Sequence, residues 1–234
     1  MLHIFHNKDD MIEAAAEKFV ELASEAIKQR GRFTVALSGG STPEPLYEML
    51  AERDDIEWSR VHIYFGDERT VPPDDEDSNY RMARLTLLDD IDASVYRIKG
   101  ELDPAEAVND YISELQAGFE SEIPRFDLML QGMGADGHTA SLFPDTTALD
   151  EHDAWVVANH VPQLDTWRIT MTYPVINNAR VVMFLIAGEE KADALYEVLK
   201  GDSNPQTYPA QAVKPTDGEL HWYLDRDAAK RIKS

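Results

Sequence analysis

The 234-residue chain contains no cysteine. It therefore has no disulfides, no thiolate nucleophile and no zinc site built on sulfur. This absence fits a reducing compartment, and we expect a cytoplasmic protein. No apolar run approaches the roughly 20 residues that a membrane-spanning helix needs, so we expect no membrane partner.

Positive charge is also scarce. The chain has 22 Lys and Arg against 44 Asp and Glu, a formal net charge of −22. Nucleic acids and anionic membrane surfaces are therefore not expected as partners. The carboxylates are spread along the chain, which favours a solvated surface over an acidic binding tail. Because the Debye length is about 8 Å at physiological salt, a few cations in a cleft can still attract an anionic ligand.

Clustered metal ligands are missing as well. His3 and His6 belong to an expected edge strand, and His152 and His160 have no second ligand at close spacing. The acidic segment 74–77 lacks the glycine of a calcium-binding loop. We therefore expect no bound metal.

Apolar residues make up 43% of the chain and include nine Tyr, eight Phe and four Trp. This is enough material for a buried core, and at this length one domain over residues 1–234 is the simplest organisation. No internal repeat or low-complexity segment divides the chain.

Short apolar runs alternate with helical patterns along the chain. Uninterrupted apolar runs are typical of parallel strands that are buried on both faces. The pattern therefore predicts a three-layer α/β/α, Rossmann-like fold with a mostly parallel sheet. Asp9 and Asp10 can cap the first helix, and Gly31 can end it. Strands are predicted at 33–37, 61–65, 95–98, 126–131, 168–172, 180–186 and 219–224, and helices at 11–30, 43–50, 79–88, 104–119, 189–200 and 226–232.

A polar, glycine-rich loop at 38–43 lies between a predicted strand and a predicted helix. Free N–H groups at a helix start bind anions, and the helix dipole favours them. Gly39 and Gly40 let the backbone approach a ligand closely, while Ser41 and Thr42 add hydroxyl donors. We expect this loop to hold a phosphate, although an ordinary capped turn uses the same residue types.

A second glycine-rich loop follows the predicted strand 126–131. Its segment 132–137 matches the dinucleotide fingerprint Gly-x-Gly-x-x-Gly, but that fingerprint opens a helix, and here Pro144 follows closely. We interpret it instead as a loop that presents Asp136 and His138. Histidine is the side chain best suited to move protons near neutral pH, and a nearby carboxylate can fix its tautomer. His138 is therefore the predicted general base.

Further candidates lie at the carboxyl ends of other predicted strands, where ligands bind in such sheets. Arg69 can pair with a phosphate and Asp67 can orient substrate hydroxyls, although a surface ion-pair cluster would have the same composition. Lys191 follows a glycine at a helix start, which suits an anion. Arg168, at a strand start, is a further candidate.

Taken together, these segments resemble the 6-phosphogluconolactonase family, within a wider fold group of glucosamine-6-phosphate deaminases and ribose-5-phosphate isomerases. Where this chain has GDER and GHTASLFP, the corresponding segments of deaminases are similar to MDEY and GHIAFNEP. Both loops of this chain follow the lactonase pattern. The matching segments are SGGSTP at 38–43, GDERTVP at 66–72, SN at 78–79, GMGADGHTASLFP at 132–144, RITMT at 168–172, GEEK at 188–191 and PAQAV at 209–213.

The resemblance implies hydrolysis of 6-phospho-D-glucono-1,5-lactone to 6-phospho-D-gluconate in the oxidative pentose phosphate pathway, without metal or organic cofactor. His138 would activate water, with Asp136 and Asp67 beside it. Backbone N–H groups of the 132–137 loop are candidate oxyanion donors. The implied phosphate-binding residues are Gly39, Gly40, Ser41, Thr42, Arg69, Lys191 and Arg168. The segment 162–165 is more acidic than the family leads us to expect, which leaves the role of Arg168 open.

Other functions stay open at this point. A phosphosugar deaminase or isomerase would use the same phosphate loop with Asp67 as the base, and a phosphosugar sensor would bind without turnover. Ser141 could be a covalent nucleophile, although no oxyanion elbow surrounds it in the sequence. The expected partner is a small phosphosugar lactone, and we expect a monomer or small homo-oligomer.

Overall fold

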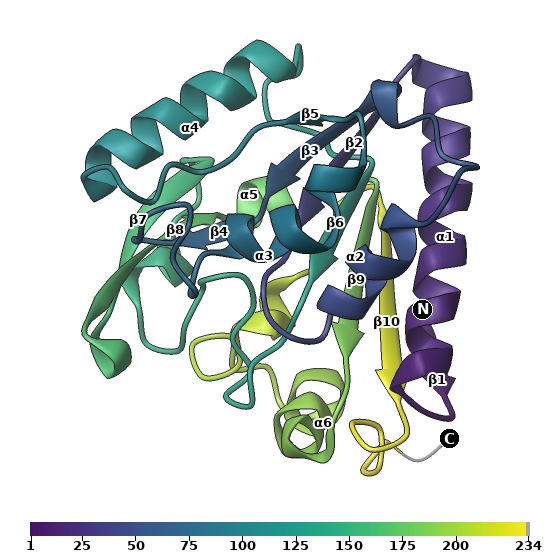
Figure 1. The fold of residues 1–234 in the computed structure, drawn as a ribbon. Coiled ribbons are helices and arrows are strands. Elements are labelled where there is room, and N and C mark those ends of the chain that lie inside the picture. Colours follow the sequence, from purple (N-terminus) through teal and green to yellow (C-terminus); the bar gives the residue numbers. More distant parts are fainter. Residues whose placement is uncertain (233–234) are drawn as a thin grey trace.

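The structure is a computed structural model that describes residues 1–232. Its main sheet has seven strands in the order β1-β10-β9-β6-β2-β3-β5, and every pairing between them is parallel (Figure 1). The prediction of an α/β fold with a mostly parallel sheet is confirmed. The strands are β1 (Leu2–Phe5), β2 (Phe33–Leu37), β3 (Val61–Phe65), β5 (Ser94–Val95), β6 (Leu128–Gln131), β9 (Val181–Ile186) and β10 (Glu219–Asp225).

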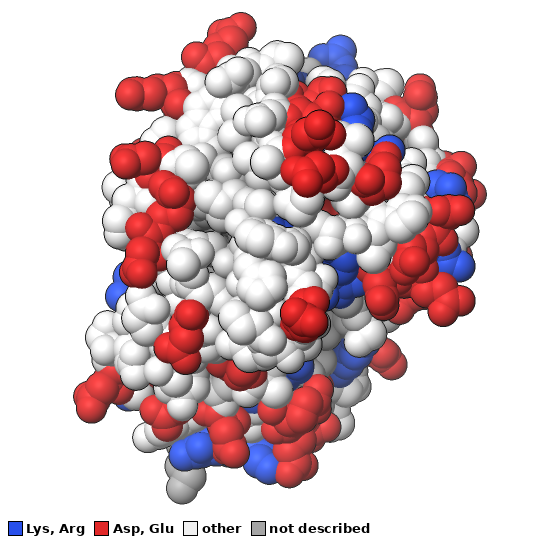
Figure 2. Space-filling model, turned by 90° about the vertical axis from the view of Figure 1, so that its left-hand side faces the viewer, with Lys and Arg blue, Asp and Glu red and all other residues white. Residues whose placement is uncertain are grey.

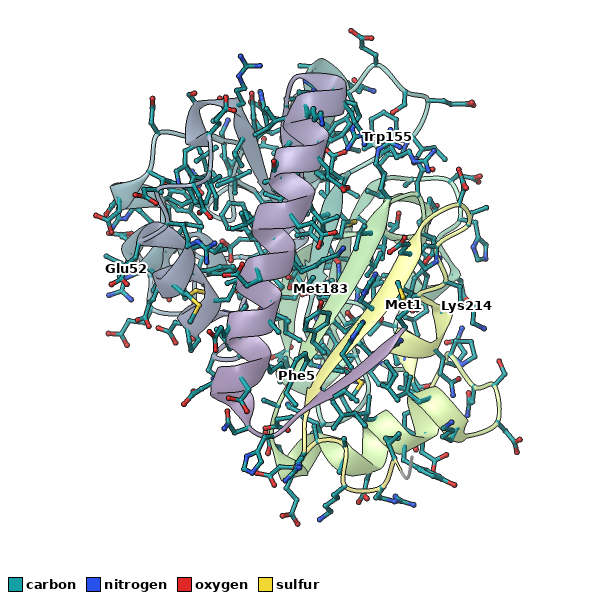
Figure 3. All side chains as sticks on the ribbon, turned by 90° about the vertical axis from the view of Figure 1, so that its right-hand side faces the viewer. Met1, Phe5, Glu52, Trp155, Met183 and Lys214 are labelled. Carbon is teal, nitrogen blue, oxygen red and sulfur yellow. The ribbon has the colours of Figure 1, made fainter. Side chains whose placement is uncertain are left out.

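Helices flank this sheet. In Figure 1, α2 and α3 lie in front of the sheet and α5 lies behind it. Figure 3 shows α1 crossing one face of the sheet, beside the edge strand that runs from Met1 to Phe5. The helices are α1 (Lys8–Arg30), α2 (Glu44–Ala51), α3 (Asn79–Thr86), α4 (Pro104–Gly118), α5 (Tyr173–Ile176) and α6 (Ala192–Lys200).

The central strands form the core. Every residue of β2, β6 and β9 is buried. Their apolar runs have no polar alternation because both faces of a parallel sheet are covered. The sequence pattern therefore identified these strands correctly.

The first helix begins earlier than predicted. The side chain of Asn7 caps it by accepting a hydrogen bond of 2.8 Å from the N–H of Asp10. Asp9 and Asp10 lie in the first turn, where their charge complements the helix dipole. The capping prediction was therefore wrong, whereas Gly31 does end the helix, with φ of 79°.

A second, antiparallel sheet was not predicted. It contains β4 (Asp67–Arg69), β8 (Thr166–Met171) and β7 (Val156–Val161), in that order. Residues 67–69 were expected to lie at the end of strand β3, but they form the separate short strand β4. Three charged residues have no apolar period, so only pairing with β8 makes β4 a strand.

Two predicted elements near chain reversals were also wrong or too long. Residues 226–231 form turns instead of the predicted helix 226–232. A helix this short has few internal hydrogen bonds to offset the cost of nucleation. The strand predicted at 95–98 is reduced to Ser94–Val95, and the helix predicted at 189–200 starts with a 3₁₀ turn at Glu189–Lys191.

The strand order explains why two distant loops meet. From β2 the chain continues outward to β3 and β5, and it later re-enters beside β2 as β6 before continuing to β9 and β10. The loops after β2 and β6 therefore leave the sheet in different directions. Such a switch point opens a crevice at the carboxyl ends of the strands, where ligands bind in folds of this class.

Acidic side chains cover much of the surface. On the face shown in Figure 2 they outnumber the basic ones and surround a largely uncharged centre. In the described part of the chain, no helix is long and apolar enough to cross a membrane.

Candidate active site

A cleft of about 250 Å³ opens at the carboxyl ends of β2 and β6. It brings together residues from five separate segments of the chain. Of the residues predicted from the sequence, all except Asp136 and Arg168 line it. The lining residues are Ser38, Gly39, Gly40, Ser41, Thr42, Pro43, Asp67, Arg69, Asn79, Gly132, Met133, Gly134, His138, Ala140, Glu190 and Lys191.

The loop after β2 presents free donors to the cleft. Within residues 1–232, the backbone N–H groups of residues 39–42 have no hydrogen-bond partner. Gly40 has a φ of 91°, a conformation that L side chains rarely adopt. At Gly39 a Cβ atom would lie 1.8 Å from Oδ1 of Asn79, so a larger residue there would displace the Asn79 side chain. The loop can therefore accept an anion closely against its backbone.

Two side chains hold this loop in place. The hydroxyl of Tyr47 donates to the carbonyl oxygen of Ser38 at 2.8 Å and accepts from its N–H at 3.1 Å. The Nζ of Lys8 donates to the carbonyl oxygen of Ser41 at 2.8 Å. The anion-accepting donors are thus fixed by α1 and α2 before any ligand binds.

His138 is oriented by Asp136. Its Nδ1 lies 2.6 Å from Oδ1 of Asp136, which also accepts the backbone N–H of His138 at 3.1 Å. The ring of Phe143 stacks on the imidazole, with ring centroids 4.1 Å apart. Because an ionised carboxylate only accepts, Nδ1 carries the proton and Nε2 is the nitrogen with a free lone pair.

The electrostatics of Asp136 agree with an ionised partner. Burial alone would raise its pKa, but the hydrogen bonds that it accepts from the side chain and backbone of His138 help to lower the pKa below its usual value. Asp136 therefore stays a carboxylate at neutral pH and continues to accept from the imidazole.

Two of the candidate oxyanion donors are occupied. The N–H of Gly134 donates to the carbonyl oxygen of His138 at 2.9 Å, and that of Gly137 donates to the carbonyl oxygen of Gly134 at 3.0 Å. These bonds shape the loop itself. Both N–H groups are therefore unavailable to a substrate in this structure.

The alternation of β4 separates its three charged side chains. Asp67 and Arg69 face the cleft, while Glu68 is 2% exposed and accepts hydrogen bonds from the backbone N–H groups of Asn79 and Tyr80, each at 2.8 Å. Burial raises the pKa of Glu68, and these backbone donors oppose the rise. Glu68 thus anchors the start of α3.

Asp67 is held from two sides. The hydroxyl of Ser141 donates to its Oδ2 at 2.6 Å, and Nδ2 of Asn79 donates to its backbone oxygen at 3.0 Å. Ser141 itself is 1% exposed and does not line the cleft. A nucleophilic role for Ser141 therefore has no geometric support.

Three cations gather at this end of the sheet. Arg69 and Arg168 are cross-strand partners in the β4–β8 pair, and Arg69 lines the cleft. Burial and then the charge of Arg69 lower the pKa of Arg168. Like charges directly opposite each other are destabilising unless an anion compensates them. Arg69 thus lines the cleft, and its cross-strand neighbour Arg168 lies outside the lining.

Lys191 comes to the cleft through a glycine turn after β9. The carboxylate of Asp225 accepts the N–H of Gly188 at 3.1 and 3.2 Å and fixes this turn. Among the residues that the structure describes, Lys191 forms no ion pair. Its ammonium group is therefore free to pair with an anion in the cleft.

Some lining residues were not predicted as site residues. Ser38 and Asn79 are buried, and Oγ of Ser38 and Oδ1 of Asn79 have no partner within residues 1–232. Buried polar atoms without partners are costly, so a ligand with hydroxyl groups would stabilise them. Their only sequence signal was their place in the SGGSTP and SN segments. No group of three or more potential metal-binding side chains was found within residues 1–232.

Comparisons with known proteins agree on one family. The sequence pattern of the family described as "Glucosamine-6-phosphate isomerases/6-phosphogluconolactonase" matches residues 6–222. A 6-phosphogluconolactonase of Synechocystis sp. is 43% identical, and the alignment covers 97% of this chain and 96% of that protein. The solved structure of 6-phosphogluconolactonase from Trypanosoma brucei is 28% identical, with a TM-score of 0.89 over 100% of this chain and 98% of the other.

The fold is shared more widely than the sequence. A monomeric glucosamine-6-phosphate deaminase superposes with a TM-score of 0.82 over 98% of each chain, at 18% identity. At this identity the likeness concerns the fold alone. The fold therefore does not separate the two chemistries, and the cleft residues must do so.

Proposed function

Because the chain belongs to the family of glucosamine-6-phosphate isomerases and 6-phosphogluconolactonases, we propose that it is a lactone hydrolase that converts 6-phospho-D-glucono-1,5-lactone to 6-phospho-D-gluconate. This reaction belongs to the oxidative pentose phosphate pathway. One observation carries the proposal. An imidazole oriented by Asp136 opens onto the same cleft as a backbone loop built to accept an anion.

In this proposal the phosphate binds at the loop after β2. The N–H groups of residues 39–42 and the hydroxyls of Ser41 and Thr42 surround it, and Arg69 and Lys191 neutralise its charge. Arg168 adds positive potential from its cross-strand position beside Arg69. Binding energy from this remote group orients the lactone carbonyl at the other side of the cleft, close to His138.

His138 then acts as general base. Its Nε2 takes a proton from water, the hydroxide attacks the lactone carbonyl, and the carbonyl carbon becomes tetrahedral. When the bond to the ring oxygen breaks, His138 returns the proton to that oxygen, so the imidazole ends neutral. Asp136 keeps Nδ1 protonated throughout and stabilises the imidazolium that forms in between.

The polar groups opposite His138 suit the sugar hydroxyls. Asp67 can accept from a ring hydroxyl, and Ser38 and Asn79 have the unpaired buried atoms described above. Fixing the ring in this way keeps the carbonyl within reach of the activated water.

A direct assay tests the proposal. Purified protein and freshly prepared 6-phosphogluconolactone are combined in weakly buffered solution, and acid release is followed above the spontaneous rate. We expect rapid release, and much slower release with the unphosphorylated lactone. Equal rates for the two lactones would contradict the phosphate site.

The same protein should release no ammonia from glucosamine 6-phosphate. This control matters because the deaminase fold is similar. Ammonia release without lactone hydrolysis would favour the deaminase function, and binding of the lactone without turnover would favour a sensor.

A further inference from the structure

Ser141 lies behind the cleft rather than in it. Its side chain is 1% exposed and comes from the loop that carries His138, whereas the carboxylate it contacts belongs to β4. The bond from Oγ to Oδ2 of Asp67 measures 2.6 Å, in the range of a charge-assisted hydrogen bond. Ser141 therefore links two segments that meet only in the folded state.

The backbone of Ser141 is fixed as well. Its N–H donates to Oγ1 of Thr170 at 3.2 Å, and its carbonyl oxygen accepts from Nδ2 of Asn159 at 2.9 Å. Thr170 and Asn159 are each 0% exposed and belong to the small sheet. One buried acceptor and one buried donor of the small sheet thus fix the backbone of Ser141, and with it the position from which its hydroxyl reaches Asp67.

The backbone conformation of Ala140, the residue before Ser141, indicates that tertiary contacts hold this turn in place. Ala140 has a φ of 47°, which is unfavourable for a residue with a Cβ atom, and it lines the cleft. Such a conformation persists where surrounding contacts over-determine it. The Leu142 N–H closes this turn by donating to the carbonyl oxygen of Thr139 at 2.9 Å, and the three hydrogen bonds of Ser141 attach the turn to the small sheet.

We propose that Ser141 is a positioning residue that aims the carboxylate of Asp67 into the cleft and sets its place relative to His138. It does not line the cleft, and in this proposal it acts only through Asp67. This inference rests on the proposed function, because it assigns Asp67 the task of holding the sugar ring. Without the Ser141 hydroxyl, the carboxylate of Asp67 would keep one hydrogen-bond donor within residues 1–232, Nδ2 of Asn79 at 3.4 Å from Oδ1.

A double-mutant cycle tests this dependence on Asp67. Ser141→Ala should lower kcat/KM for the phosphorylated lactone roughly 10- to 100-fold, as expected for loss of a hydrogen bond to a charged group. In an Asp67→Ala background the same change should cost less than about 2-fold, because the carboxylate that accepts the hydrogen bond is already absent. Equal effects in both backgrounds would overturn the proposal.

The matched control is Thr146→Val. Thr146 is 5% exposed. Its hydroxyl accepts from the same Asn159 at 3.0 Å and donates to the carbonyl oxygen of Phe143 at 2.8 Å, and within residues 1–232 it makes no hydrogen bond to Asp67. Its removal should lower the melting temperature while kcat/KM stays within about 2-fold. A loss of activity in Thr146→Val equal to that in Ser141→Ala would make the role of Ser141 merely structural.

Two additions keep the outcome decisive. If Ser141→Ala fails to fold, Ser141→Cys keeps the volume with a weak donor and should give an intermediate loss. The cycle is repeated with calorimetric binding of 6-phosphogluconate, which needs no turnover. If the protein binds 6-phosphogluconate and the two substitutions are coupled, but no lactonase activity is found, the proposed function is overturned and the role of Ser141 is supported. If the enzyme is active but the effects of the two substitutions are additive, the role of Ser141 is overturned and the proposed function is supported.

Discussion

The two ends of the main sheet use their arginines differently. At the amino-terminal end, Nε of Arg30 and of Arg180 lie 2.9 and 3.3 Å from the same buried oxygen of Asp127, and Arg125 pairs with Asp217 at 3.1 Å. At the carboxyl end, Arg69, Arg168 and Lys191 have no carboxylate partner within residues 1–232. The paired cations neutralise the fold's own carboxylates, whereas Arg69 and Lys191 line the cleft and are available to an anion.

The buried carboxylate of Asp127 explains why Arg30 and Arg180 are paired at the amino-terminal end of the sheet. Asp127 is 6% exposed and accepts the N–H and the hydroxyl of Thr34 at 2.8 and 3.0 Å in addition to its arginines. It therefore ties the starts of β2 and β6 together. Among the 22 Lys and Arg of this acidic chain, Arg30 and Arg180 thus serve the fold, whereas Arg69 and Lys191 line the cleft.

The largest expected effect concerns the cleft. His138→Ala should lower kcat roughly 10²- to 10⁴-fold with little change in KM, as for loss of a general base. His160→Ala, at an exposed position of β7, is the matched control and should keep the wild-type rate. Steady-state kinetics of both variants check this, and near wild-type turnover without His138 would remove it from the mechanism.

A change at the opposite end should affect folding instead. Asp127→Asn leaves Arg30 and Arg180 without their counter-charge, and we expect a loss of about 3 kcal/mol in the free energy of unfolding. KM should stay unchanged, because no cleft residue contacts Asp127 in the described structure. Urea unfolding followed by circular dichroism measures the loss. A raised KM at unchanged stability would break the contrast between the two ends.

Removing an unpaired cation should show the reverse pattern. Lys191→Ala or Arg69→Gln should raise KM roughly 10- to 100-fold for the phosphorylated lactone, with kcat and stability nearly unchanged. The unphosphorylated lactone should be unaffected. Arg60→Gln removes an exposed cation paired with Glu57 and serves as control. If it raised KM as much, the effect would come from net charge instead of from the cleft.

The smallest effect is a pH dependence at Asp136. Its pKa is lower in the folded protein, so it contributes stability above its unfolded pKa of about 3.9, and this contribution is lost as pH falls through the folded value. The difference in melting temperature between wild type and Asp136→Asn should therefore shrink as pH drops from about 5 to 3. A difference that stayed constant over this range would contradict an ionised Asp136.

Much of the main sheet was predictable because its strands are buried on both faces and read as continuous apolar runs. Residues 33–37 and 61–65 were predicted with their bounds as observed. Of the small sheet, the strand predicted at 168–172 is observed as β8 (Thr166–Met171). The strand β4 was missed because it consists of charged residues whose strand conformation depends on pairing with β8. The single-domain organisation stays a prediction.

Local pattern alone determined several features of this protein. These are the parallel α/β architecture, the anion-accepting loop after β2, and the carboxylate–histidine pair, whose members are two residues apart. Only the tertiary structure decided which cations are unpaired, that Asp67 and Glu68 face opposite ways, and that Ser141 reaches Asp67. The physical reason is sequence separation, because hydrogen bonds within a loop are set locally, whereas contacts between β4 and the His138 loop exist only once the strand order brings them together.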